Sequence, residues 1–144
     1  MIEVFFNELR DWKPEQAREL RSPLIKVSLI VPTKAGVDQI IPNLTCLIDT
    51  GSDYCRLDTG FAETNNLPTL GKVTSFGMGA SISVDTYKCT VIFDDTARLA
   101  VGFGGYPFRM EKNDFDLSLG MQALQHFDFV LKAAEQKATL QFRG

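Results

Sequence analysis

The chain has 144 residues and a formal net charge of -3, from 15 basic and 18 acidic side chains. Hydrophobic residues make up 44% and charged residues 23%, which is typical of one globular domain and excludes a fibrous or disordered chain. The basic residues are scattered along the sequence, so we expect no nucleic-acid partner. No long apolar run and no basic leader is present, so we also expect no membrane partner and no secretory segment.

Three cysteines and one histidine restrict the possible metal and redox chemistry. Cys46, Cys55 and Cys89 cannot all pair within one chain, and none has the Cys-x-x-Cys spacing of a zinc or redox site. They are best interpreted as reduced core residues, which favours a cytoplasmic location. His126 alone cannot build a histidine-rich metal site, and we expect it to be a packing or capping residue. The sequence therefore predicts no metal and no cofactor.

The N-terminal part differs in pattern from the rest of the chain. We interpret residues 1–23 as an appendage, in which Pro14, followed by Ala17 and Leu20, predicts a short exposed helix. From residue 24 onward the pattern is that of β-strands. We therefore place one all-β domain over residues 24–144.

The first strands of this domain lead to an acidic residue. Branched apolar residues predict a core strand over 25–31, and glycine, aspartate and proline predict a turn within 34–43. Residues 44–48 then predict a second buried strand, which ends directly at Asp49.

A short helix and a long hairpin are predicted next. Asp58 is placed to cap a helix that the residues around Asn65 would end. A hairpin follows, with strands at 72–76 and 81–93 joined by the tip Gly77-Met78-Gly79-Ala80, where glycine permits positive φ. The remaining elements are predicted as strands at 98–101, 115–119, 128–132 and 138–142, a glycine-rich loop at 102–106, and a helix at 121–127.

The segment Asp49-Thr50-Gly51-Ser52-Asp53 carries the main chemical signal. A carboxylate at the end of a buried strand resists ionisation unless hydrogen bonds or a shared proton compensate for the lost water, so a functional reason is worth seeking. However, Asp and Gly are ordinary turn residues, and Asp-Thr-Gly occurs by chance in many proteins. On this triplet alone, an ordinary turn is the better interpretation.

A second motif changes this balance. Downstream of the hairpin, Leu117-Ser118-Leu119-Gly120 is an apolar strand closed by glycine and followed by a predicted helix. In this order the segments 47–52, 76–82 and 117–124 resemble the retropepsin-like aspartic peptidases, whose pattern is an apolar pair with Asp-Thr-Gly-Ala/Ser, a flap hairpin, and an apolar pair closed by glycine. The resemblance covers the region 24–142.

The resemblance implies a closed acid-protease barrel with one or two short helices that functions as a homodimer. It implies that Asp49 is the catalytic carboxylate, one of a pair that shares a proton. Because the chain has a single Asp-Thr-Gly, two copies related by a twofold axis would have to supply the pair. Thr50 would then hydrogen-bond across the interface, and Gly51 would leave room for a peptide substrate and offer its amide near the carboxylate.

The resemblance also implies where a peptide would bind. Ser52 and Asp53 would lie beside the substrate, and the tip residues Gly77, Met78, Gly79 and Ala80 would form a flap that closes over it. The glycine-rich stretch that begins at Gly102 is a weaker candidate for the flap.

The sequence departs from the retroviral pattern at one position. Met121 stands where retroviral members have an arginine, so Asp53 lacks the basic partner expected there. Two alternatives to a peptidase stay open: a peptide-binding or dimerisation module of the same fold that cuts slowly or not at all, and, less favoured, a phosphotransferase that uses Asp49 as its nucleophile.

Overall fold

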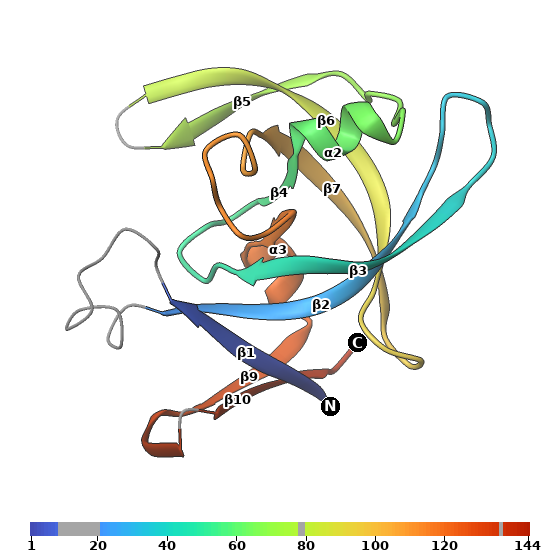
Figure 1. Cartoon of the computed structure of the whole chain (residues 1–144). Coiled ribbons are helices and arrows are strands. Elements are labelled where there is room, and N and C mark those ends of the chain that lie inside the picture. Colours follow the sequence, from blue (N-terminus) through green and yellow to red (C-terminus); the bar gives the residue numbers. More distant parts are fainter. Residues whose placement is uncertain (9–20, 78–79, 136) are drawn as a thin grey trace.

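A computed structural model of the chain describes residues 1–8, 21–77, 80–135 and 137–144. The described part is mostly β, with ten strands in one mixed sheet and two short α-helices (Figure 1). The elements are β1 (Ile2–Glu8), β2 (Arg21–Val31), β3 (Gln39–Ile48), β4 (Cys55–Asp58), α2 (Thr59–Thr64), β5 (Lys72–Gly77), β6 (Ala80–Ile92), β7 (Arg98–Tyr106), β8 (Leu117–Leu119), α3 (Met121–Leu124), β9 (Phe127–Lys132), the 3₁₀ turn η1 (Ala133–Glu135) and β10 (Lys137–Phe142).

Six of the strands form a partial ring. The sheet order is β5-β6-β7-β4-β8-β3-β2-β1-β10-β9, and an additional pairing of β6 with β2 brings the two ends of the run from β6 to β2 together. β8 lies between β3, to which it is parallel, and β4, to which it is antiparallel. The predicted all-β class is therefore confirmed at the level of a mostly β fold with a partial ring.

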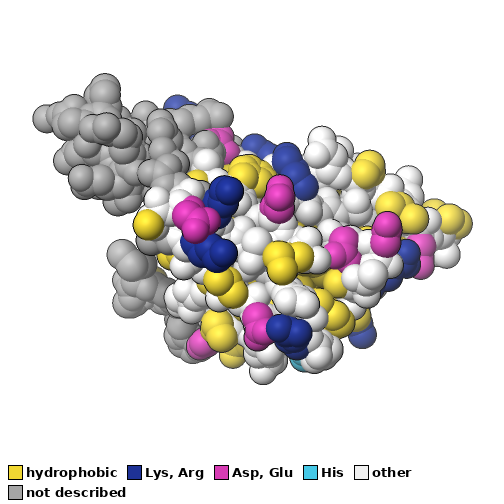
Figure 2. Space-filling view, turned by 90° about the horizontal axis from the view of Figure 1, so that it is seen from below, with side chains coloured by type: hydrophobic (Ala, Val, Ile, Leu, Met, Phe, Trp, Pro, Cys, Tyr) yellow, Lys and Arg dark blue, Asp and Glu magenta, His cyan; other side chains and the backbone are white. Residues whose placement is uncertain are grey.

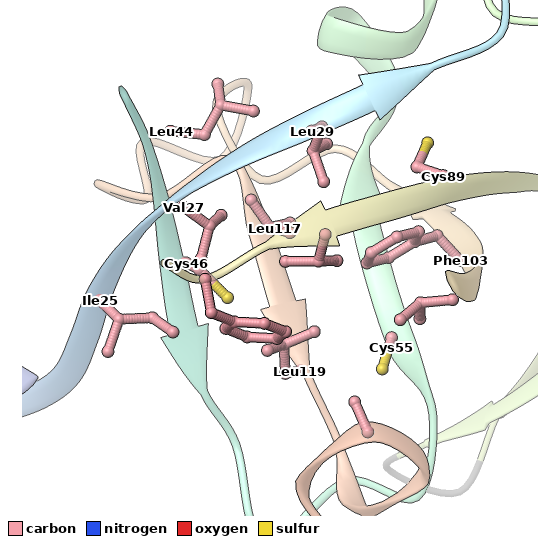
Figure 3. Packing of buried hydrophobic residues seen from close by; sticks show 14 of the residues in the cluster. Ile25, Val27, Leu29, Leu44, Cys46, Cys55, Cys89, Phe103, Leu117 and Leu119 are labelled. Atoms are coloured by element: carbon pink, nitrogen blue, oxygen red, sulfur yellow. The ribbon is translucent and has the colours of Figure 1, made fainter. Parts of the chain in front are cut away.

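The hydrophobic core fills the interior of this ring. Figure 3 shows side chains from β2, β3, β4, β6, β7 and β8 pointing toward one another, among them Cys46, Phe103, Leu117 and Leu119. Leu117 and Leu119 are 0% exposed, and burying a leucine stabilises a fold by about 1.5–3 kcal/mol. The three residues of β8 are thus held in place by burial as well as by pairing on both sides.

The N-terminal residues contribute a strand to the sheet. β1 pairs with β10 through Ile2 and Leu140, and with β2 through Phe5 and Leu24. Ile2 and Val4 are buried in the core. Part of the predicted appendage is therefore integrated into the sheet, because its alternating apolar residues find a buried face. The helix predicted after Pro14 lies outside the described residues.

The predicted capped helix is confirmed. The Asp58 carboxylate accepts a hydrogen bond of 2.9 Å from the amide of Phe61, which is the third residue of α2. At the other end, the amide of Asn65 donates to the carbonyl of Phe61. A side-chain acceptor before the first turn and asparagine at the end are local signals, so this helix could be found from sequence.

The glycine-rich stretch 102–106 is not a loop, as the sequence suggested, but the second half of β7. Gly102 and Gly104 pair with Lys88 and Thr86 of β6, while β4 pairs with the other edge of β7. Phe103, between the two glycines, is buried in the core. Pairing on both edges and the buried phenylalanine compensate for the low strand preference of glycine. This stretch is thus no longer a candidate for the flap.

Candidate active site

Asp49 lies immediately after the last residue of β3, as predicted. Its backbone amide donates to the carbonyl of Leu119 at 2.9 Å, which extends the parallel pairing of β3 and β8 by one residue. One carboxylate oxygen of Asp49 accepts a hydrogen bond of 3.1 Å from the amide of Gly51. The side chain is half-buried, so the carboxylate is oriented by the backbone while part of it remains accessible.

The loop that follows Asp49, residues 50–54, is held against the start of α3 by hydrogen bonds, and we call it the clamped loop. The carbonyls of Ser52 and Asp53 accept hydrogen bonds from the amides of Met121, at 2.7 Å, and Gln122, at 2.9 Å. These contacts satisfy two amides in the first turn of α3, which have no partner within the helix. The two motifs that the sequence analysis singled out therefore touch each other directly.

Gly120 makes this contact possible. A Cβ atom at this position would lie 2.4 Å from the carbonyl oxygen of Tyr54 and 2.6 Å from that of Ser52. Backbone atoms cannot approach a side-chain carbon so closely, so only glycine fits here without displacing the loop. The glycine that closes the second motif thus has a packing reason that concerns the Asp49 loop.

The other predicted residues of the loop have distinct environments. Thr50 and Asp53 are exposed, and the Ser52 hydroxyl donates to the carbonyl of Tyr54 at 2.9 Å instead of contacting the Asp49 carboxylate. Within the described part of the chain Asp53 forms no ion pair. The Ser52 hydroxyl therefore stabilises the loop itself in this structure.

The predicted hairpin is formed by β5 and β6, whose pairing extends to Gly77 and Ala80. The tip residues Met78 and Gly79 lie outside the described residues. In Figure 1 the arrows of β3 and β5 both run to the left, so the ends of the strands that lead to Asp49 and Gly77 lie on the same side of the molecule.

A hollow of about 370 Å³ lies between this hairpin and the ring. Tyr54 and Gln122 lie beside the clamped loop and contribute to the wall of the hollow. The hollow therefore adjoins this loop, although Asp49 itself does not line the hollow. Its volume is at the lower end of the range for small-molecule sites. The lining also includes residues of β4, β5, β6 and β7, namely Cys55, Arg56, Val73, Thr74, Ser75, Val84, Thr86, Tyr87, Gly102, Phe103, Gly104 and Gly105, together with Leu70.

A polar cluster anchors the chain just before β8. The carboxylate of Asp116 forms an ion pair with Arg109, with a nitrogen–oxygen distance of 3.0 Å, and accepts from the amide of Thr45 at 3.0 Å. Asp58 is nearly fully buried and accepts from the amide of Arg109 as well as from α2. This cluster ties β3, β4 and the segment before β8 together, so it has a structural role beside the site.

The three cysteine thiols are free and buried. Burial raises the pKa of each thiol, that of Cys89 to about 12. At neutral pH these thiols are therefore protonated and unsuited to nucleophilic or metal-binding chemistry. Among the described residues, no group of three or more His, Cys, Asp or Glu side chains could hold a metal ion.

Comparisons with known proteins add no family assignment. No protein-family model matches the chain, and no curated protein matches it. Of the helices that the structure describes, none is long and apolar enough to cross a membrane. On the face shown in Figure 2, acidic and basic side chains are interspersed with hydrophobic ones and do not gather by sign.

Several residues of the site were not found from sequence. Tyr54, Arg56 and Gln122 line the hollow, but β4, which carries Arg56, was not predicted as a strand. The alternation of buried Cys55 and Leu57 with half-buried Arg56 was the available signal, and four residues are too few for it to stand out.

Proposed function

We propose that two copies of the chain form an aspartic endopeptidase with a retropepsin-like barrel, in which each copy supplies one Asp49. The observation that supports this most directly is the clamped loop after β3, where the Gly51 amide orients the Asp49 carboxylate 3.1 Å away. A partly accessible carboxylate that is oriented by a backbone amide, in a loop that adjoins a hollow, suits acid–base work on a bound substrate.

The proposed reaction is hydrolysis of a peptide bond by an activated water. One Asp49 of the pair is ionised and accepts a proton from the water, while the protonated Asp49 of the other copy polarises the scissile carbonyl. The water attacks without a covalent enzyme intermediate, and the reaction needs no metal or cofactor.

Dimerisation is part of this mechanism. A twofold axis brings equivalent residues together, so an axis beside the loop would place two Asp49 side chains face to face. Thr50, which is exposed in the isolated chain, would then meet its counterpart and tie the two loops together. Asp53 lacks the arginine partner of the retroviral pattern, so the amides of Met121 and Gln122 take over the bracing of this loop within each copy.

The proposed substrate is an extended peptide with apolar side chains near the cleaved bond. The β5–β6 hairpin, with Gly77 and Ala80 at its described end, would cover the peptide and offer backbone hydrogen bonds to it. The hollow beneath the hairpin would receive one side chain of the peptide.

The first experiment compares the protein with its Asp49→Asn variant on a mixed peptide library from acidic to neutral pH. Cleavage by the original chain and loss of cleavage in the variant would support the peptidase. Peptide binding by both proteins without cleavage would indicate the peptide-binding module instead. Asp95→Asn, which removes an exposed carboxylate from the turn between β6 and β7, serves as the control and should still cleave.

A second experiment tests whether the active site is shared. When an equal amount of Asp49→Asn is allowed to exchange subunits with the active protein, random pairing should lower the total activity to about half, because mixed dimers lack one carboxylate. An activity that is unchanged by the added variant would contradict the proposal. So would cleavage of peptides under conditions in which sedimentation shows the protein to be strictly monomeric.

A further inference from the structure

The hollow beneath the β5–β6 hairpin is mainly apolar, but a cationic side chain lies in its lining. Leu70, Val73 and Val84 are apolar residues of its wall. Arg56, in the middle of β4, is half-buried among them. A guanidinium in such surroundings has lost part of its hydration, and this costs free energy unless an acceptor or an opposite charge replaces the water.

Within the part of the chain that the structure describes, the contacts of Arg56 leave most of its hydrogen-bonding capacity unused. One terminal nitrogen donates to the Ser75 hydroxyl at 3.3 Å, and the guanidinium lies 5.3 Å from the centre of the Tyr106 ring. A guanidinium has five N–H donors. Over the described ranges, with residues 9–20, 78–79 and 136 left aside, no carboxylate forms an ion pair with Arg56.

Several carboxylates of neighbouring elements have other partners. Asp58, two residues along β4, accepts from the amides of Phe61 and Arg109. Asp116 pairs with Arg109, and Asp85, on the hairpin side, pairs with Lys72 at 3.1 Å. The guanidinium of Arg56 is therefore available to a ligand that enters the hollow.

Glycines on β7 keep the space next to Arg56 open. Gly104 pairs directly with Arg56 in the parallel β4–β7 register, and Gly102 lies on the same face of β7. A Cβ at Gly104 would already touch Val84 at 3.4 Å, whereas a Cβ at Gly102 would meet nothing within 4 Å. Larger residues on this face would fill the floor of the hollow.

We infer that the hollow is a specificity pocket for a substrate side chain with an apolar stem and a carboxylate end, such as glutamate, and that Arg56 is the residue that recognises the carboxylate. The planar guanidinium matches a carboxylate in a two-pronged arrangement, and the apolar walls suit the methylene stem. This inference rests on the proposed function, because it assumes that the ligand is a side chain of the bound peptide.

The experiment uses pairs of peptides that differ only in glutamate against glutamine at one position of a cleaved sequence. The original protein should cleave the glutamate peptide with a kcat/KM at least about tenfold higher at the position that enters the hollow. Arg56→Met, which keeps the stem but removes the charge, should abolish this preference, and Arg56→Lys should retain part of it. Arg98→Met, which removes an exposed arginine at the start of β7, is the control and should keep the preference.

The same peptides distinguish failure of the inference from failure of the proposed function. If peptides are cleaved but glutamate is not preferred, or if Arg56→Met keeps the preference, the inference is wrong while the peptidase stands. If no peptide is cleaved, the affinity of the protein for each of the paired peptides is measured by fluorescence anisotropy. Equal binding of the two peptides, or no binding, would overturn the inference. Gly102→Leu, which should fill the hollow, gives a second test: it should lower kcat/KM for the glutamate peptide and remove its advantage over the glutamine peptide.

Discussion

Replacement of Gly120 by alanine tests the contact between the loop that follows Asp49 and the motif that ends at Gly120. The added Cβ would lie 2.4 Å from the carbonyl oxygen of Tyr54, about 1 Å inside an ordinary van der Waals contact. Because the opposing atoms belong to the backbone of the clamped loop, they cannot rotate away as a side chain would. The loop must therefore move, and the amides of Met121 and Gln122 lose their acceptors.

The expected loss of stability is large for a single methyl group. Overpacking costs about 1–3 kcal/mol, and each hydrogen bond that is broken adds about 0.5–1.5 kcal/mol. We therefore expect Gly120→Ala to lower the free energy of unfolding by about 2–6 kcal/mol, measured by urea denaturation with an unchanged slope. The control is Gly102→Ala, where the new Cβ meets nothing within 4 Å, and there we expect a change within about 0.5 kcal/mol.

Two outcomes would refute this reasoning. A Gly120→Ala protein as stable as the original would mean that the loop does not approach Gly120 in solution. An equal loss in both alanine variants would mean that the effect comes from replacing glycine in general and not from the contact with Tyr54. Peptide cleavage by the variant, under conditions where it remains folded, would then show whether displacement of the loop also disturbs Asp49.

Three further predictions concern other parts of the chain. Asp58→Ala should lower the free energy of unfolding by about 2–4 kcal/mol in urea denaturation, because the amides of Phe61 and Arg109 lose a buried acceptor, whereas Asp58→Asn should cost less. In native protein the three buried thiols should react slowly with a disulfide reagent at neutral pH, and all three should react after unfolding; a fast-reacting thiol in the native protein would contradict the burial seen here. Hydrogen bonds from the Thr96 amide and hydroxyl lower the pKa of Asp94, so its contribution to stability should be present at neutral pH and should be lost as the pH falls below about 4 and through the lowered pKa. The thermal midpoint of Asp94→Asn should therefore lie below that of the original protein at neutral pH and approach it in acid, and a constant difference would exclude this origin.

Elements with local signals could be predicted from the sequence. The cap at Asp58, the branched apolar run of β2 and the strand that ends at Asp49 all depend on residues within a few positions of one another. The hairpin of β5 and β6 has the same character, since its strands are consecutive. Physical rules for caps, strands and turns were sufficient for these elements.

Elements that depend on distant partners could not be predicted. β1 is a strand because β2 and β10 lie on its two sides, and β7 continues through three glycines because β4 and β6 pair with it. Strand formation reflects packing against neighbours more than intrinsic preference. The sequence of β4, with four residues, gave too short a pattern, and its arginine therefore escaped notice as part of a site.

The candidate site depends both on a local sequence motif and on contacts with residues that are distant in the sequence. The loop that begins at Asp49 was visible as a motif, but its geometry depends on Leu119 and Gly120, about seventy residues further along the chain. β8 lies between β3 and β4 and pairs with both, so its position depends on strands that are distant from it in the sequence. The position of the Asp49 loop therefore depends on its contacts with the end of β8 and the start of α3, and Gly120 is the residue that allows these contacts.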